Sequence, residues 1–71
     1  MDLKQIEYIL KIAEENNVTK AAEKLFISQS ALNQQLLKLE KELGAPLFFR
    51  TRNNWTLTEI GELYVQNAKE I

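Results

Sequence analysis

The sequence of 71 residues contains no cysteine and no histidine. Without cysteine the chain can form no disulfide bond, and without either residue it lacks the usual ligands of zinc. The commonest nucleophiles and neutral-pH proton carriers are missing for the same reason. We therefore expect no metal site, no cofactor and no catalytic residues.

Glycine and long apolar runs are also scarce. The two glycines, Gly44 and Gly61, stand too far apart to build a phosphate-cradling loop. No apolar run approaches the roughly 20 residues that span a bilayer. The start of the chain carries an acid at position 2 and becomes amphipathic at once, unlike a signal peptide. These absences predict a cytoplasmic protein that is neither an enzyme nor bound to a membrane.

Charge is distributed unevenly along one small domain. Hydrophobic residues make up 45% of the chain and charged residues 27%, as in a soluble globular domain with a modest core. The net charge is only −1. However, residues 18–54 hold six basic and three acidic side chains, a net +3, whereas the flanks carry −4. A basic middle between acidic ends favours an anionic partner for the central segment.

The first 27 residues predict two helices. Asp2 is a good N-cap, and apolar residues recur at helical spacing over residues 3–15: Leu3, Ile6, Ile9, Leu10 and Ala13. Thr19 is expected to cap a short second helix over residues 20–25, which buries Ala21 or Ala22 together with Leu25. Phe26 and Ile27 are expected to fill a tight turn after it.

A longer third helix should follow, capped by Ser28 and ended by Gly44. Its apolar stripe consists of Leu32, Leu36, Leu39 and Leu43. The opposite face holds Ser30, Gln34, Leu37 and Lys41, flanked by Asn33 and Lys38. Two helices joined by a short turn, the second with a polar first turn, describe a helix-turn-helix.

The remaining residues predict a hairpin and a fourth helix. Apolar and aromatic residues at 47–49 and 55–57 favour short strands, and the RTRNN segment between them favours a turn at Asn53 and Asn54. Thr58 caps a helix from residue 59, with an apolar side of Ile60, Leu63, Tyr64, Ala68 and Ile71. The sequence ends there without a C-cap, so we expect this helix to continue. The predicted fold class is mainly α: a winged helix-turn-helix with a three-helix core, a β-hairpin wing and the start of a linker helix.

These residues together resemble the DNA-binding domain of LysR-type transcriptional regulators. The family pattern is matched by Thr19, Lys20, Ala21, Ala22, Leu25, Ser28, Gln29, Ala31, Leu32, Leu39, Glu40, Leu43, Gly44, Pro46, Leu47, Phe48, Arg50, Leu57, Thr58 and Gly61. The match covers essentially the whole chain. The sequence departs from the pattern at Ser30, often proline in the family, at Gln34, often arginine, and at Leu37, often basic.

The resemblance implies a bacterial DNA-binding domain over residues 1–58 and the beginning of a linker or dimerisation helix over residues 59–71. It implies a pseudo-palindromic double-stranded DNA operator, with the third helix in the major groove and the wing on the backbone or minor groove. Family members form homodimers or tetramers through the linker helix and sense a small-molecule effector in a further domain, which this sequence lacks. The expected location is the cytoplasm, at the bacterial nucleoid.

The resemblance and the side-chain chemistry together assign two sets of DNA contacts. Base edges would be read by Gln29, Ser30, Asn33 and Gln34. Asn and Gln amides form bidentate hydrogen bonds with adenine, so this set is expected to prefer A·T base pairs. The DNA backbone would be held by Thr19, Lys20, Ser28, Lys38, Arg50 and Arg52.

Each assignment has a plainer alternative. A polar helix face is often only solvated surface, and Arg50 could instead pair with Glu40 or Glu59. Phe48, Phe49 and Trp55 are better explained by packing in the hairpin than by base stacking. The alternative function is a protein–protein interaction module on a helix-turn-helix scaffold, with Leu37 and the apolar edge of the fourth helix as its contact.

Overall fold

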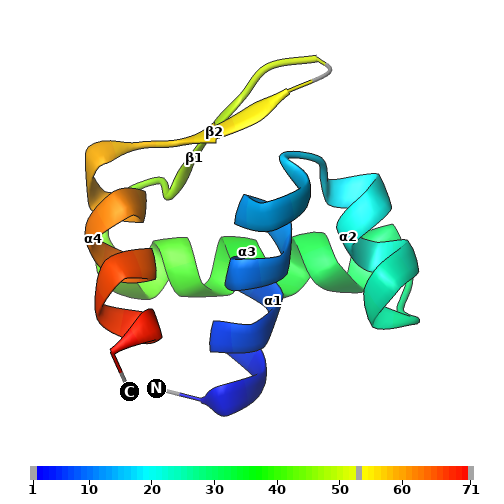
Figure 1. The fold of residues 1–71 in the computed structure, drawn as a ribbon, viewed down its shortest axis with the longest axis horizontal. Helices are drawn as coiled ribbons and strands as arrows, with labels where there is room; N and C mark the ends of the chain where they lie inside the picture. The colour runs from blue at the N-terminus through cyan, green and yellow to red at the C-terminus, as the bar shows by residue number, and fades with distance from the viewer. Residues whose placement is uncertain (1, 53, 71) are drawn as a thin grey trace.

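A computed structural model describes residues 2–52 and 54–70 of the chain. The elements follow in the order α1 (Leu3–Glu15), α2 (Val18–Leu25), α3 (Gln29–Leu43), β1 (Phe48–Arg50), β2 (Trp55–Leu57) and α4 (Glu59–Lys69). In Figure 1, α3 runs behind α1 and α4, α2 packs at one end, and the hairpin projects above the helices. The predicted fold, a mainly helical winged helix-turn-helix, is confirmed.

Three of the predicted helix caps are confirmed. Asp2 Oδ1 accepts the N–H of Lys4 at 2.8 Å, and Ser28 Oγ accepts the N–H of Ala31 at 3.0 Å. Thr58 Oγ1 accepts the N–H of Gly61 at 3.0 Å. Each bond satisfies a backbone donor that the first turn of a helix leaves without a partner. The caps therefore fix where α1, α3 and α4 begin.

The predicted start of the second helix was wrong. Asn17, not Thr19, is the N-cap of α2, and its Oδ1 accepts the N–H of Lys20 at 2.9 Å. The earlier start turns Val18 inward, where it is 7% exposed. Burial of this side chain in the core is favourable. The helix therefore begins two residues earlier than the local sequence signals predicted. Thr19 consequently lies in the first turn of α2.

The core is formed by all four helices and the first half of the hairpin. Its buried apolar residues are Ile6, Ile9, Ile12, Val18, Ala21, Ala22, Leu32, Leu36, Leu39, Leu47, Phe48, Tyr64 and Val65. Both Ala21 and Ala22 are buried, which resolves the open choice between them. Their small side chains let α2 approach its neighbours closely, and this approach sets the position of α3.

Four apolar residues expected inside lie at the surface instead. Leu3 is exposed at the start of α1, and Leu43 is 46% exposed at the end of α3 because Glu40 takes the inward position there. Ile60 and Leu63 are exposed on α4, which buries Gly61, Tyr64 and Val65 instead. Ile71, predicted on the same apolar side, lies outside the described residues.

Phe26 does not fill the turn between α2 and α3 as predicted. Its side chain is 94% exposed, and its backbone has a φ of 59°, in the left-handed region. This conformation ends α2, with the N–H of Phe26 donating to Glu23 O and that of Ile27 to Ala22 O. Ile27 alone packs against the core.

The hairpin is shifted by one residue on its first strand. β1 covers Phe48–Arg50 rather than residues 47–49, and β2 covers 55–57 as predicted. The antiparallel register pairs Phe48 with Leu57, Phe49 with Thr56 and Arg50 with Trp55. Asn53, half of the predicted turn, lies outside the described residues.

Backbone hydrogen bonds help to hold the hairpin in place at both ends of β2. The N–H of Trp55 donates to Asn16 O at 2.9 Å, which ties β2 to the connection between α1 and α2. The N–H of Thr58 donates to Leu47 O at 3.0 Å, where the second strand passes into α4. The hairpin therefore projects from the helical body at a fixed place near the start of α2.

Candidate nucleic-acid interface

The outward face of α3 is polar near its start and basic farther along. Gln29, Ser30 and Gln34 are exposed, and Asn33 is half-buried. Lys38 and Lys41 are exposed one to two turns later, with the 45%-exposed Leu37 between the two groups. The structure thus brings the four predicted base-reading residues together on the first two turns of one helix. Their contact with DNA stays a prediction.

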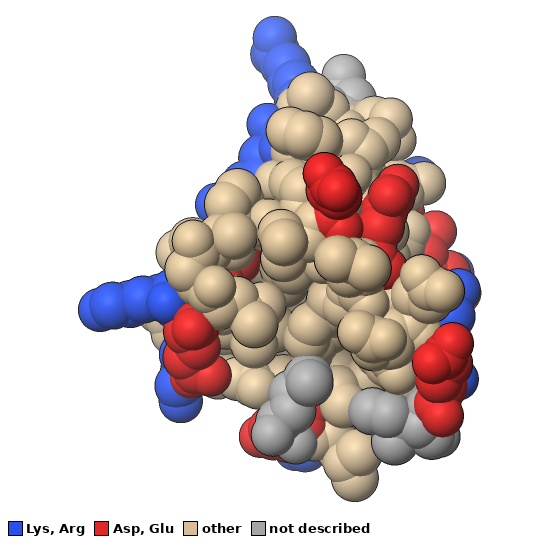
Figure 2. Space-filling model, turned by 90° about the vertical axis from the view of Figure 1, so that its left-hand side faces the viewer, with Lys and Arg blue, Asp and Glu red and all other residues tan. Residues whose placement is uncertain are grey.

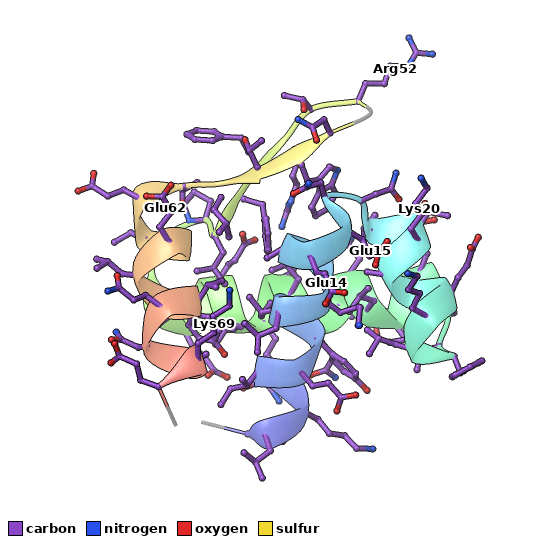
Figure 3. All side chains as sticks on the ribbon, in the orientation of Figure 1. Glu14, Glu15, Lys20, Arg52, Glu62 and Lys69 are labelled. Carbon is purple, nitrogen blue, oxygen red and sulfur yellow. The ribbon has the colours of Figure 1, made fainter. Side chains whose placement is uncertain are left out.

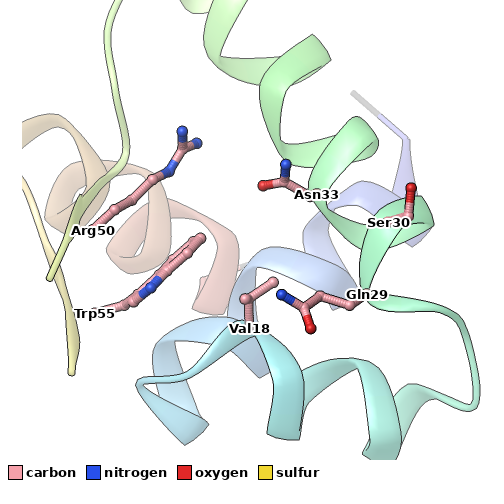
Figure 4. Close-up of a pocket in the computed structure, with 6 residues that line it drawn as sticks. All are labelled: Val18, Gln29, Ser30, Asn33, Arg50 and Trp55. Atoms are coloured by element: carbon pink, nitrogen blue, oxygen red, sulfur yellow. The ribbon is translucent and has the colours of Figure 1, made fainter. Parts of the chain in front are cut away.

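A hydrogen bond links Thr19, a predicted DNA-backbone contact, to Gln29, a predicted base-reading residue. The hydroxyl of Thr19, expected to bind phosphate, donates to Gln29 Oε1 at 2.9 Å. This bond uses one of the two acceptor lone pairs of the Gln29 amide oxygen, and the NH₂ group points towards Val18 (Figure 4). The bond from Thr19 therefore fixes the orientation of the Gln29 amide, with its oxygen towards α2 and its NH₂ group free to donate.

Arg50 is held by a buried carboxylate. Arg50 Nη2 donates to Glu40 Oε1 at 2.5 Å, and Glu40 Oε2 accepts the N–H of Leu47 at 2.6 Å. The Arg50 guanidinium also lies 5.3 Å from the ring centroid of Trp55, whose ring is 5.9 Å from that of Phe48. The alternative pairing of Arg50 with Glu40 is present, and Glu59 is not its partner. A DNA contact by Arg50 stays a prediction.

An open cleft of about 490 Å³ lies between the Arg50–Trp55 pair of the hairpin and the start of α3. Its lining residues are Val18, Gln29, Ser30, Asn33, Arg50 and Trp55. In Figure 4, Arg50 and Trp55 reach from the hairpin towards the α3 residues across the cleft. Three of the predicted base-reading residues thus share one cavity with a predicted backbone contact, while Gln34 lies outside it.

Trp55 is the cleft residue that sequence reasoning assigned only to packing. It does pack against Phe48, but it also lines the cleft. Directly paired residues of a hairpin share a face, so the pairing of Arg50 with Trp55 places both on the cleft side. The predicted first strand ended at residue 49, so the sequence did not show that Arg50 pairs with Trp55.

The basic residues at the edges of this surface are free of ion pairs. Among the described residues, Lys20, Lys38 and Arg52 form no salt bridge, whereas Lys24 pairs with Glu15 at 3.1 Å. In Figure 3, Arg52 extends from the tip of the hairpin, and Lys20 lies on the same side of the molecule. Figure 2 shows basic side chains at the hairpin tip and acidic ones scattered over the face formed by α4.

The described residues contain no cluster of acidic side chains suited to a metal ion. Within residues 2–52 and 54–70, no helix combines the length and apolar character needed to cross a membrane. The side chains at the cleft and on α3 offer hydrogen bonds from amides and hydroxyls, and lysine and arginine attract anions.

Comparison with protein families gives one clear match. The model of the bacterial regulatory helix-turn-helix proteins of the lysR family matches residues 3–62. The chain is 44% identical over 72 residues to the HTH-type transcriptional regulator BsdA of Bacillus subtilis (strain 168), covering 100% of this chain and 25% of BsdA. It is 42% identical over 71 residues to BudR of Klebsiella aerogenes, covering 100% of this chain and 50% of BudR.

Solved structures agree with this match. The DNA-binding domain of BenM in complex with catB site 1 DNA superimposes with a TM-score of 0.93 at 37% identity. That alignment covers 99% of this chain and 78% of the BenM chain. The DNA-binding domain of CbnR in complex with DNA gives a TM-score of 0.92 at 31% identity, covering 99% of this chain and 80% of the other. The chain spans about a quarter of the length of several relatives that it matches, BsdA among them.

Proposed function

The chain belongs to the lysR family of bacterial regulatory helix-turn-helix proteins, and we propose that it is the DNA-reading domain of a transcriptional regulator. In this proposal α3 enters the major groove of double-stranded DNA and the hairpin contacts the backbone or the adjacent minor groove. The observation that carries the proposal is the exposed polar face of α3 beside unpaired basic side chains. The similarity to domains solved on DNA supports it.

Base reading falls to the first two turns of α3. Ser30, Asn33 and Gln34 can each donate to and accept from base edges, and the two amides suit adenine. Gln29 differs because the bond from Thr19 turns its carbonyl oxygen towards α2 and leaves the NH₂ group as the part of the amide that is free to donate. It should therefore prefer base acceptors such as thymine O4 or guanine O6 and N7.

Attachment to phosphates falls to residues around this face. Lys20 at the start of α2, Lys38 on α3 and Arg52 on the hairpin supply positive charge. Ser28 Oγ accepts the N–H of Ala31, so its own hydroxyl proton stays available for a phosphate oxygen. Thr19 contributes through Gln29 rather than through its hydroxyl, since that hydroxyl is already engaged.

The wider assembly is part of the same proposal. Residues 59–71 would begin a linker helix through which a longer parent protein dimerises or forms tetramers on a pseudo-palindromic operator. A groove of about 260 Å³ formed by Leu43, Ile60, Leu63, Tyr64 and Asn67 leaves apolar side chains of α3 and α4 exposed, as such packing requires. The regulator would act in the bacterial cytoplasm, without catalysis, and would bind its effector in another domain.

A protein–protein interaction module remains the second candidate. The observation that favours it is the exposed apolar surface formed by Leu43, Ile60 and Leu63. Leu37 is exposed as well, on the outward face of α3. The salt dependence of affinity separates the two functions. For DNA, the slope of log affinity against log salt concentration is about −0.9 for each phosphate neutralised. Contact with an apolar groove predicts a shallow dependence on salt.

Two alanine variants separate reading from attachment. Gln34→Ala should change base preference, because one good bidentate pair discriminates between bases by about 1–3 kcal/mol. Arg52→Ala should weaken binding to all sequences and lower the salt slope by about 1. Binding curves on a panel of duplexes at several salt concentrations measure both effects.

Lys69→Ala is the matched control for Arg52→Ala, because it removes one positive charge from α4, away from the proposed interface (Figure 3). It should leave affinity and salt slope nearly unchanged. The reverse pattern, with Arg52→Ala changing base preference and Gln34→Ala changing only the salt slope, would show that the two roles are exchanged.

Thr19→Val should alter the base preference of Gln29. Valine keeps the shape of threonine but cannot donate to Gln29 Oε1, so the amide is free to turn and adenine becomes acceptable at the base it contacts. Thr19→Ser keeps the donor and should keep the preference. Selection from a duplex pool compares the three proteins. Uniform weakening by Thr19→Val with an unchanged preference would instead assign its hydroxyl to a phosphate.

A further inference from the structure

The cleft between α3 and the hairpin lies where a DNA strand would pass in the proposed complex. This inference rests on the proposed function. With α3 in the major groove and the hairpin at the adjacent minor groove, one sugar–phosphate strand separates the two elements. That strand has to cross the space between them. The cleft lined by Asn33 on one side and by Arg50 and Trp55 on the other is this space.

Arg50 is built into the wall of the cleft. Its guanidinium is bonded to Glu40 Oε1, lies 5.3 Å from the Trp55 ring, and belongs to a side chain that is only 35% exposed. Held on two sides, Arg50 is not arranged to extend to the floor of a groove. A guanidinium has five N–H donors, however, and the bond to Glu40 uses Nη2. The other donors can serve an anion that enters the cleft.

Trp55 supplies a second kind of donor at the same wall. Its half-buried indole ring points into the cleft in Figure 4. Indole Nε1–H can only donate, and the hydrogen bonds between described side chains include none from it. A ring that packs on Phe48, lines an open cleft and carries one N–H donor suits contact with a charged oxygen.

We propose that this cleft seats one phosphodiester of the DNA strand that runs between the two grooves. Arg50 supplies positive charge, the Trp55 indole N–H donates to a phosphate oxygen, and Asn33 closes the opposite wall. Since a phosphodiester carries no base information, the site adds affinity without adding sequence preference. Trp55 thereby becomes a DNA-backbone contact as well as a packing residue.

Trp55 is the only tryptophan of the chain, so its fluorescence reports on the cleft directly. The test is acrylamide quenching of the full chain, alone and saturated with a short duplex of mixed sequence at low salt. A label on the duplex reports binding independently through its anisotropy. We expect duplex binding to reduce the quenching constant several-fold. Inorganic phosphate at the same phosphate concentration should not change it, because an isolated ion lacks the contacts of the duplex on α3.

Two variants test the donor itself. Trp55→Phe keeps an aromatic ring against Phe48 and Arg50 but removes the N–H, and should lower affinity by about tenfold on every duplex. The salt slope should not change, because the indole is neutral. Phe49→Leu is the matched control, since Phe49 is 58% exposed on the other face of the hairpin. It should leave affinity unchanged. Thermal unfolding followed by circular dichroism checks that both variants are folded.

The outcomes separate this inference from the proposed function. Duplex binding that leaves Trp55 equally accessible to acrylamide, or an unchanged affinity of Trp55→Phe, would overturn the phosphodiester seat and leave DNA binding intact. Protection of Trp55 by inorganic phosphate alone would overturn its assignment to a duplex strand. No anisotropy change at low salt would overturn the proposed function, and the seat with it.

Discussion

Replacing Gly61 with alanine should destabilise the domain by about 3 kcal/mol or more. A Cβ at this position would overlap Leu47 O and would lie 3.0 Å from Leu57 Cδ2. The carbonyl cannot easily move, because it accepts the N–H of Thr58 at 3.0 Å. Overpacking against backbone costs about 3 kcal/mol or more, out of a total stability of about 4–10 kcal/mol for a domain of this size.

Gly44→Ala is the control for this variant. Gly44 ends α3 at a φ of 76°, and a Cβ there would meet no atom within 4 Å. Its replacement therefore costs only backbone strain, about 1 kcal/mol. The thermal unfolding midpoint of Gly61→Ala should be lower than that of Gly44→Ala by about 10 °C or more. Equal midpoints would mean that α4 can move away from Leu47, and that the close approach does not fix its place.

Replacing Glu40 with alanine should both destabilise the domain and weaken DNA binding. The Glu40 side chain is 10% exposed, and its two oxygens accept from Leu47 N–H and from Arg50. Removing it leaves a buried N–H and a guanidinium without partners, which costs about 3 kcal/mol. The hairpin then loses its tie to α3, so its phosphate contacts are no longer held in place.

Glu42→Ala provides a control of equal charge. Glu42 is exposed on α3 two residues later, and its loss should change the free energy of unfolding by no more than about 0.5 kcal/mol. Urea unfolding measures stability, and duplex binding is measured at a temperature at which all variants are folded. If Glu40→Ala behaves like Glu42→Ala in both measurements, the carboxylate does not hold the hairpin.

The sequence predicts the helices well because their signals are local. Asp2, Ser28 and Thr58 cap helices through bonds to residues two or three positions away, and these bonds depend little on the rest of the fold. The start of α2 was missed because burial of Val18 in the core decides it. The exposure of Leu43 likewise depends on how Glu40 meets Leu47 and Arg50, which are distant in sequence.

In the candidate site too, local features could be predicted from the sequence, whereas contacts between elements could not. The position of the polar face on α3 follows from helical periodicity, so Gln29, Ser30, Asn33 and Gln34 could be grouped from the sequence. Which partners these side chains have could not be predicted, because the Thr19–Gln29 bond depends on the angle between α2 and α3. The choice of Glu40 over Glu59 for Arg50 depends on how the hairpin lies across the helices.

The most direct test of sequence-specific DNA binding is selection of this chain against a pool of random duplexes, followed by sequencing, at two salt concentrations. The same selection is repeated with α4 fused to a parallel dimeric coiled coil, because two linked half-site contacts raise affinity. We expect enrichment of a half-site and an affinity that falls steeply with salt. Failure of the dimeric fusion to enrich any sequence, with weak binding that depends little on salt, would contradict DNA reading by α3.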